Sequence, residues 1–198
     1  MNRKFSFFAL ISRMKNITRW SLMRNNSLEN IQEHSHIVSV LAHALAVIRR
    51  DVFKHETDPG LAASIALFHD SSEIFTGDLP TPIKYYDTEI MEAYKKVEAV
   101  ASQKLLSALP AELRSSYEKI LSPTDDPDLL LLVKAADRLA AYIKCIEELK
   151  TGNLDFRLAA EQSKEKLMSL NLPEVDYFME NFIPAFELTL DELDFSFE

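Results

Sequence analysis

The stretch NIQEHSHIVSVLAHALAVIRR, Asn30 to Arg50, decides the fold class of this chain. Asn30 followed by Glu33 resembles a capping box, which predicts the start of a helix that runs to about Arg50. One stripe with helical spacing collects Ile31, His34, Val38, Leu41, Leu45 and Ile48. The opposite stripe collects His36, Val40, His43 and Val47. A helix that is apolar nearly all round is typical of the centre of a helical bundle.

The composition of the whole chain favours the same fold class. Among 198 residues, 47% are hydrophobic and only 3 are glycine, which favours helices over a sheet with many tight turns. We predict an all-α fold, a single compact domain over residues 1–198 with roughly seven or eight helices. Capping residues and prolines place these helices at about 5–14, 30–50, 58–70, 87–109, from 110 onward, 126–149, 154–170 and 173–188. Residues 19–30 lack a helical period and are predicted to form a loop.

The charge of the chain limits its partners. A net charge of −9 argues against a protein that coats a nucleic-acid polymer. Residues 1–28 hold six bases and no acid, whereas residues 171–198 hold eight acids and no base. The basic end could meet a small anionic ligand, and the alternative is two solvated faces that happen to be polarised.

Export and membrane signals are missing from the sequence. The apolar run Phe5–Ile11 is followed by Arg13 without a cleavage site, and no run approaches the ~18 apolar residues of a membrane span. The single cysteine, Cys145, cannot form an intramolecular disulfide and fits a reducing compartment. We therefore expect a cytoplasmic protein without membrane contact.

Candidate metal ligands occur on the predicted helices. His34 lies on the buried stripe of its helix, where the alternative to a ligand is a hydrogen-bonded core histidine. His69 and Asp70 end the helix that starts near residue 58, and Glu73 follows within one turn on the same face. Carboxylates at the partly negative C-terminal end of a helix require a cation nearby to offset them.

Asp137 is a further candidate ligand, set among alanines in VKAADRLAAY, residues 133–142. An ion pair with Lys134 or plain solvation is the alternative, but a carboxylate held there without a partner would be costly. With the two histidines and Asp70 it forms a cysteine-free set, suited to one first-row divalent ion with positions left for water and substrate. Such an ion polarises a phosphoryl oxygen and generates hydroxide from water, so the set predicts hydrolysis of a phosphate ester.

The order His34, His69-Asp70, Asp137 resembles the H…HD…D signature of the HD-domain phosphohydrolase superfamily, which is all-helical and metal-dependent. Longer strings resemble the bacterial HD-domain 5′-deoxynucleotidases: RWSLMRN (19–25), ENIQEHS (29–35), HDSSEIFTGDLPTPIKYY (69–86), VKAADRLAAYIKCIEELKTGN (133–153) and MENFIPAFELTLDEL (179–193). The resemblance extends from about residue 5 to residue 193 and includes every motif of that family.

The resemblance implies an enzyme that removes phosphate from deoxyribonucleoside 5′-monophosphates and works as a homodimer. It implies one divalent ion per chain, with cobalt or manganese as activators, held by His34, His69, Asp70 and Asp137. It also implies a substrate site formed by Arg19, Trp20, His34, Glu73, Asp78, Leu79, Pro80, Thr81 and Asp137. No role is transferred to the intervening string NNSLENIQ, residues 25–32.

Chemistry gives several of these residues specific roles. Arg19 can bind two oxygens of a phosphomonoester dianion at once. Trp20, if it presses against C2′, would bury a ribose hydroxyl without a partner and favour deoxyribose by roughly 5- to 150-fold; its alternative role is a core or interface anchor. Glu73 and Asp78 are candidates for orienting the attacking water and for protonating the leaving 5′ oxygen, in either order. Their alternative roles are caps and turn residues around Gly77.

Other activities compete with this interpretation. Another HD-superfamily hydrolase, acting on a nucleotide diester, triphosphate or alarmone, shares the metal ligands, and a non-catalytic nucleotide-binding helical module shares the fold. Gly77 lacks the GxxxxGK context of a P-loop, which disfavours a kinase or ATPase. We predict direct in-line attack by metal-bound water without a covalent enzyme intermediate.

Overall fold

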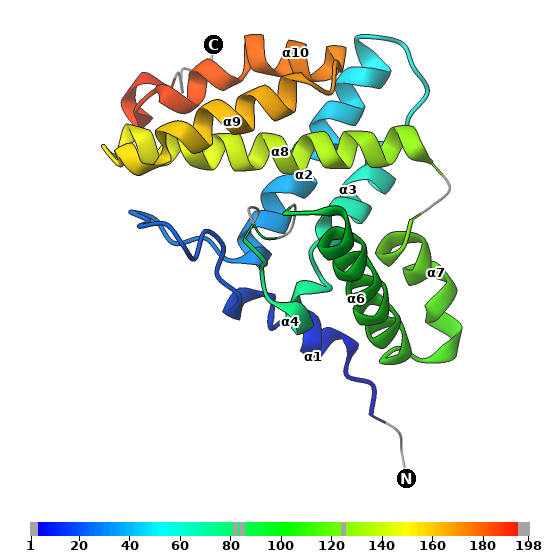
Figure 1. The fold of residues 1–198 in the computed structure, drawn as a ribbon. Coiled ribbons are helices and arrows are strands. Elements are labelled where there is room, and N and C mark those ends of the chain that lie inside the picture. Colours follow the sequence, from blue (N-terminus) through cyan, green and yellow to red (C-terminus); the bar gives the residue numbers. More distant parts are fainter. Residues whose placement is uncertain (1–3, 81–82, 84–85, 124–125, 194–198) are drawn as a thin grey trace.

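The computed structural model describes residues 4–80, 83, 86–123 and 126–193. Within these residues the chain forms helices and no named strand, and the only extended pairing is an isolated antiparallel bridge between Thr18 and Asn30. The predicted all-α fold is therefore confirmed (Figure 1).

The helices fall into three groups along the chain. The N-terminal part holds α1 (Phe7–Ile11), the 3-10 turn η1 (Met14–Asn16), α2 (Ile31–Asp51), α3 (Pro59–Phe68) and α4 (Glu73–Thr76). The middle part holds α6 (Thr88–Ser107), α7 (Ala111–Leu121) and α8 (Pro127–Lys150). The C-terminal part holds η2 (Leu154–Phe156), α9 (Arg157–Met168), α10 (Pro173–Asn181), η3 (Ile183–Glu187) and η4 (Leu190–Glu192).

Side-chain caps start the long helices where the sequence predicts them. Asn30 forms a complete capping box with Glu33, and the carboxylates of Asp58, Asp87 and Asp126 accept backbone amide hydrogen bonds at the starts of α3, α6 and α8. These caps satisfy amides that a helix leaves without partners. The predicted loop over residues 19–30 is also correct.

Several predicted helix ends differ from the structure. The last predicted helix, 173–188, ends at Asn181 and continues only as the 3-10 turn η3, which contains Pro184. Proline has no amide hydrogen and disfavours helical backbone in the residue before it, so an α-helix cannot pass through intact. The first predicted helix is divided into α1 and η1, and α3 ends at Phe68 instead of near Asp70.

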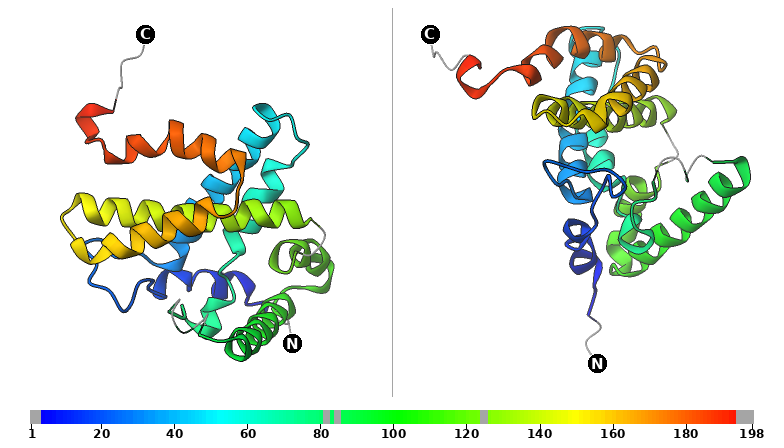
Figure 2. Two further views of the ribbon diagram at one scale, coloured as in Figure 1. Left: turned by 45° about the horizontal axis from the view of Figure 1, so that its top comes forward. Right: turned by 60° about the vertical axis from the view of Figure 1, so that its left-hand side comes forward.

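Helix α8 runs across the middle of the molecule and crosses α2 (Figure 1). In the view of Figure 1, helices α9 and α10 lie above α8, and α6 and α7 lie below it, and Figure 2 shows the same helices from two further directions. The main core forms where α2, α3, α8 and α10 pack together, with Val38, Leu45, Leu132, Leu139 and Phe178 among its buried side chains. This crossing brings the N-terminal turn of α2, the end of α3 and the middle of α8 to one place.

The two stripes of α2 have different environments. Every residue of the first stripe, which includes His34, is buried. The second stripe is less enclosed than its apolar pattern predicts, because Val40 is 53% exposed and His36 and His43 are exposed as well. Helices α3, α8 and α10 all pack against α2 from the side of the first stripe and leave the other open.

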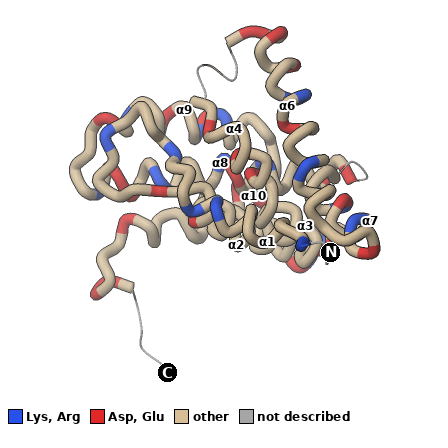
Figure 3. The backbone as a smooth tube through the Cα atoms, turned by 90° about the horizontal axis from the view of Figure 1, so that it is seen from below, with Lys and Arg blue, Asp and Glu red and all other residues tan. Residues whose placement is uncertain are grey.

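Acidic and basic residues are spread over most helices, as the coloured backbone in Figure 3 shows from below. The described residues beyond position 170 carry acids and no base, as the sequence shows. None of the helices in the described ranges combines the length and apolar character that crossing a membrane requires.

A buried ion pair fixes the loop over residues 19–30 to α8. Lys144 and Glu148, 5% and 1% exposed, are one turn apart on α8, and the Lys144 Nζ donates to Glu148 Oε1 and to the Ser27 carbonyl. Glu148 also accepts the backbone amides of Asn26 and Ser27 at 2.9 and 3.0 Å. Burial alone would raise the pKa of Glu148, but Lys144 and these amides lower it to about 2.

We expect Glu148→Ala to destabilise the protein by about 3–5 kcal/mol, because it leaves the Lys144 charge buried without its partner. Urea unfolding followed by circular dichroism measures this loss. Glu147→Ala changes the neighbouring exposed glutamate and is the matched control. Equal stability of the two variants would contradict the prediction.

Candidate active site

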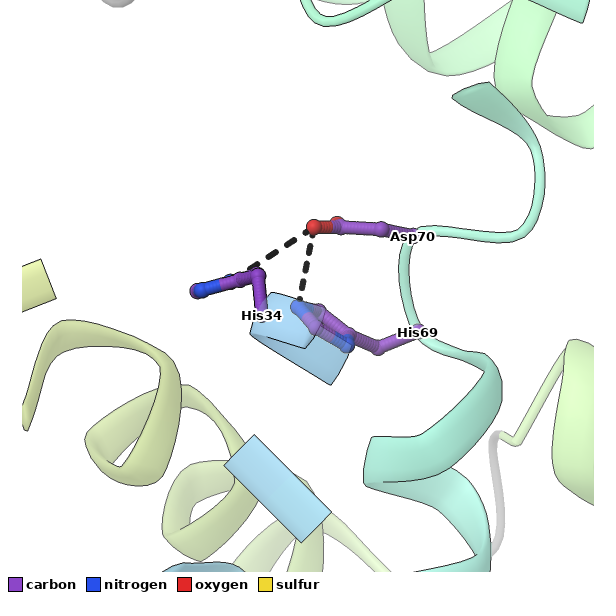
Figure 4. Close-up of side chains that lie close together, drawn as sticks. All are labelled: His34, His69 and Asp70. Atoms are coloured by element: carbon purple, nitrogen blue, oxygen red, sulfur yellow. Dashed lines mark ion pairs between the residues drawn. The ribbon is translucent and has the colours of Figure 1, made fainter. Parts of the chain in front are cut away.

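His34 on α2 and His69 and Asp70 just after α3 point toward one another (Figure 4). His34 lies in the first turn of α2, where the capping box fixes the backbone, and His69 and Asp70 directly follow the last residue of α3. Asp70 Oδ2 lies 3.2 Å from His69 Nε2 and 3.6 Å from His34 Nε2. One ligand atom from each residue falls within 4.8 Å of the other two, a spacing that can hold a metal ion.

Asp137 reaches the same group from α8. Its Oδ1 lies 3.0 Å from His34 Nε2 and 3.9 Å from His69 Nε2. The Asp137 side chain is 41% exposed, whereas His34 is fully buried, so the group opens to solvent on the Asp137 side. The four predicted ligands therefore converge, and Asp137 has a histidine partner instead of being only a solvated residue.

The hydrogen bonding of His69 fits a metal ligand. His69 Nδ1 lies 2.7 Å from the Ala66 carbonyl oxygen, and a carbonyl can only accept, so Nδ1 carries the proton. In the neutral imidazole, Nε2 then carries the lone pair and faces Asp70 and Asp137. This is the arrangement that metal-bound histidines adopt, with the outer nitrogen bonded to a backbone carbonyl or carboxylate.

The protonation of the group also indicates that it needs positive charge. Burial opposes the charged form of His69, but Asp70 and Asp137 outweigh burial and raise the pKa of His69 well above its usual value. Burial likewise opposes ionisation of both carboxylates, yet the histidines hold the pKa values of Asp70 and Asp137 below the usual range. A divalent cation between the histidines and carboxylates would supply the charge that protonated imidazole otherwise provides.

Arg19, in the loop over residues 19–30, places a positive charge beside this group. Its Nη1 lies 3.2 Å from Asp70 Oδ2, and its Nε donates to Glu29 Oε2 at 3.1 Å. Burial alone would lower the pKa of Arg19, but Asp70, Asp137, Glu29 and Asp78 together raise it. Arg19 is therefore charged and lies at the edge of the candidate metal group.

Trp20 is held next to Arg19 in a strained conformation. Its φ of 56° lies in the left-handed region, which bulky residues rarely adopt. The indole Nε1 donates to Glu29 Oε2 at 3.0 Å, and the ring packs on Phe156 with centroids 5.3 Å apart. Trp20 is half-buried, so it acts as an anchor against Phe156 and still presents part of its surface to solvent.

Glu73 and the residues from Asp78 onward follow the His69-Asp70 turn. The Glu73 amide donates to the Asp70 carbonyl at 3.0 Å, and Glu73 is buried. Gly77, with φ of 72°, ends α4 and turns the chain. Asp78 lies near enough to Arg19 to help raise the pKa of that guanidinium, and Leu79 and Pro80 are half-buried beyond it. Thr81 lies outside the described residues.

Two features of the site are absent from the sequence-based prediction. Glu29 contacts Arg19, Trp20 and His34, although residues 25–32 receive no role from the family resemblance. The Lys144–Glu148 pair fixes the same loop. The i, i+4 spacing of Lys144 and Glu148 is a usable signal for their pairing. Glu29 begins the family-like string ENIQEHS, but it has no periodic signal that would place it at the site.

Solved structures share this fold. An HD-domain phosphohydrolase from Listeria innocua superposes with a TM-score of 0.80 at 24% identity, covering 91% of this chain and 88% of that one. A cyanophage S-2L HD phosphohydrolase, solved with dA and one catalytic Zn²⁺ ion, superposes with a TM-score of 0.61 at 24% identity, covering 89% and 96% of the two chains. At these identities the similarity establishes the HD-domain fold.

Sequence relatives are much nearer. A 5′-deoxynucleotidase of Photobacterium profundum is 48% identical over 191 residues, which cover 96% of this chain and 98% of the relative. A 5′-deoxynucleotidase of Vibrio cholerae is 50% identical over 188 residues, which cover 94% and 97%. Residues 6–186 match the family model described as 5′-deoxynucleotidase YfbR-like. The chain therefore belongs to the YfbR-like family of 5′-deoxynucleotidases.

Proposed function

We propose that this protein is a metal-dependent phosphohydrolase that converts deoxyribonucleoside 5′-monophosphates to deoxyribonucleosides and phosphate. The observation that carries the proposal is the convergence of His34, His69, Asp70 and Asp137 beside the charged Arg19. Family membership gives the reaction class, and the site contains the donors that this reaction needs.

His34, His69, Asp70 and Asp137 would hold one divalent ion. Two imidazole nitrogens and two carboxylates form a mixed donor set that suits first-row divalent ions such as cobalt or manganese. When bound, such an ion supplies Lewis-acid polarisation of a phosphoryl oxygen and lowers the pKa of a water molecule. The partial exposure of Asp137 leaves a route by which water and substrate reach the ion.

Arg19 would bind the phosphate. Its Nε is held by Glu29 and its Nη1 lies 3.2 Å from Asp70 Oδ2, so the guanidinium plane is fixed beside the candidate metal group. A planar guanidinium can bond two phosphate oxygens at once. The charge of the substrate also requires a cation such as Arg19. A phosphomonoester is a dianion, and it must approach a site that contains several carboxylates in a chain of net charge −9.

Glu73 and Asp78 would handle the protons of the hydrolysis. The water oxygen bonds to phosphorus, the bond from phosphorus to the 5′ oxygen breaks, and the leaving oxygen needs a proton. Glu73 is a buried carboxylate within one turn of Asp70, and Asp78 lies near Arg19. One would orient the water and the other would protonate the leaving group, while Leu79, Pro80 and Thr81 would line the nucleotide.

Trp20 would set the preference for deoxyribose. Its indole edge is fixed by Glu29 and its ring by Phe156, so the exposed part of the ring is a rigid apolar surface. A ribose 2′-hydroxyl pressed against that surface loses water without gaining a hydrogen bond.

We further propose that the enzyme is a cytoplasmic homodimer and that it has no nucleic-acid polymer as partner. The family resemblance supports the dimer, and the single cysteine and negative charge support the compartment and the absence of polymer binding. Size-exclusion chromatography with light scattering tests the dimer, since a monomeric mass at assay concentration would contradict it.

A paired substrate panel tests the function. We expect phosphate release from dAMP with added Mn²⁺ or Co²⁺, release from AMP that is roughly 5- to 150-fold slower in kcat/KM, and loss of activity after chelation. Initial rates of phosphate release at several substrate concentrations give these values. A cyclic dinucleotide, a deoxynucleoside triphosphate and an alarmone test the competing HD-superfamily activities.

Each outcome of the panel has a definite meaning. Equal kcat/KM for AMP and dAMP would contradict the deoxyribose preference but not the phosphohydrolase activity. Faster hydrolysis of the cyclic dinucleotide, the triphosphate or the alarmone would replace the proposed substrate class. Tight binding of dAMP without turnover under any metal would favour a non-catalytic module.

A further inference from the structure

We propose that Glu29 is a positioning residue that fixes the metal side and the substrate side of the site together. Its carboxylate contacts the guanidinium of Arg19, the indole of Trp20 and the outer nitrogen of His34. The inference deepens the proposed function and rests on it for the roles of these three residues. Glu29 itself would contact neither the metal nor the substrate.

The two carboxylate oxygens of Glu29 have different partners. Oε2 accepts hydrogen bonds from Arg19 Nε at 3.1 Å and from Trp20 Nε1 at 3.0 Å. Oε1 faces His34 Nδ1 at 3.7 Å. One side chain therefore spans both substrate-side residues and a candidate metal ligand.

The ion pair between Glu29 and Arg19 is mostly shielded from water. The side chains of Arg19 and Glu29 are 13% and 16% exposed, so solvent screens their attraction less than it screens a surface ion pair. The Glu29 carboxylate therefore holds its two donors, Arg19 Nε and Trp20 Nε1, in a partly buried position.

Backbone hydrogen bonds fix the position of Glu29 relative to its partners. The Arg19 amide donates to the Glu29 carbonyl at 2.9 Å, and the Ile31 amide donates to the Ile17 carbonyl at 3.0 Å. Glu29 directly precedes Asn30, which caps α2, and Ser27 is bound to Glu148. The loop is therefore held by hydrogen bonds at both ends and in its middle. These bonds leave the Glu29 carboxylate little freedom to move away from Arg19, Trp20 and His34.

The contact with His34 matters when a metal is bound. If His34 gives its Nε2 lone pair to a metal, its proton resides on Nδ1, which points at Glu29 Oε1. The separation of 3.7 Å is longer than a hydrogen bond, and a shift of about 0.7 Å would close it. A carboxylate behind a metal-bound histidine orients the ring and makes it a stronger ligand.

The test uses the full-length protein with Glu29→Gln and Glu29→Ala, and Glu56→Gln as a matched control at an exposed glutamate. Calorimetric titration of the metal-free protein with Mn²⁺ should show affinity 10- to 100-fold weaker in both Glu29 variants. Trp20 is the only tryptophan, so its fluorescence reports the substrate side directly. Acrylamide should quench Trp20 more strongly in Glu29→Ala than in the wild type, and Glu56→Gln should match the wild type in both measurements.

Activity distinguishes this inference from the proposed function. Wild-type hydrolysis of dAMP, with reduced kcat/KM and weaker Mn²⁺ binding in the Glu29 variants, supports both. Wild-type Mn²⁺ affinity and wild-type Trp20 quenching in Glu29→Ala would overturn the positioning role even if the enzyme hydrolyses dAMP. If Glu29→Ala does not fold by circular dichroism, the isosteric Glu29→Gln decides the matter through Mn²⁺ affinity alone. A wild-type protein inactive on dAMP would remove the proposed function, while the binding and fluorescence measurements would still test the geometry.

Discussion

Replacing Asp137 by alanine is expected to abolish measurable hydrolysis of dAMP, with a loss of kcat on the order of 10³-fold or more. Asp137 is the only member of the four-residue set that comes from α8, and its Oδ1 lies within 4 Å of both histidines. Its removal takes away one proposed ligand and the carboxylate that faces solvent. Metal ions contribute several kcal/mol to phosphoryl transfer, and each 1.4 kcal/mol corresponds to a factor of ten.

The same variant should bind Mn²⁺ more weakly without unfolding. Asp137 is only partly buried, so alanine creates no large cavity, and alanine has a higher helix propensity than aspartate in the middle of α8. Calorimetric titration with Mn²⁺ and circular dichroism separate loss of metal from loss of fold.

Asp128→Ala is the matched control because Asp128 is an exposed aspartate in the first turn of the same helix. It should lose at most about 1 kcal/mol of stability through the helix dipole and keep full activity. Full activity of Asp137→Ala at saturating Mn²⁺ would contradict the metal-centred mechanism.

The sequence predicts helix starts far better than helix ends. An Asp or Asn followed within a residue or two by a helix former is a local chemical signal, and Asn30, Asp58, Asp87 and Asp126 all act as predicted. The end of a helix depends on tertiary packing, which has no local signal in the sequence. Helix α3 therefore ends two residues before its predicted end, and the last predicted helix is interrupted at Pro184.

The candidate metal group was predictable for a different reason. His34 lies on a stripe that periodicity alone marks as buried, and the resemblance to HD-domain enzymes adds the order of the other ligands. Glu29 could not be found this way, because its contacts arise from a loop that has no period. The sequence also leaves open whether Trp20 is an anchor or contacts substrate, and the packing of its ring on Phe156 shows that it is an anchor.

Replacing Arg19 by lysine is expected to lower kcat/KM for dAMP by about 10- to 150-fold while leaving Mn²⁺ affinity close to that of the wild type. Lysine keeps the positive charge near Asp70 but cannot bond two phosphate oxygens in one plane, and it cannot keep the Arg19 Nε bond to Glu29. Hydrogen bonds to charged groups contribute about 1.5–3 kcal/mol each, which corresponds to the expected range.

Arg24→Lys is the matched control, since Arg24 is an exposed arginine in the same loop. It should leave kcat/KM unchanged, because among the described residues of this loop it is Arg19, and not Arg24, that pairs with Asp70. In the proposed mechanism, phosphate binding depends on the shape of the guanidinium as well as on its charge. An Arg19→Lys enzyme with wild-type kcat/KM would show that charge alone suffices. A loss of activity accompanied by an equal loss of Mn²⁺ affinity would instead place Arg19 with the metal ligands, as a group that orders Asp70 and not the phosphate.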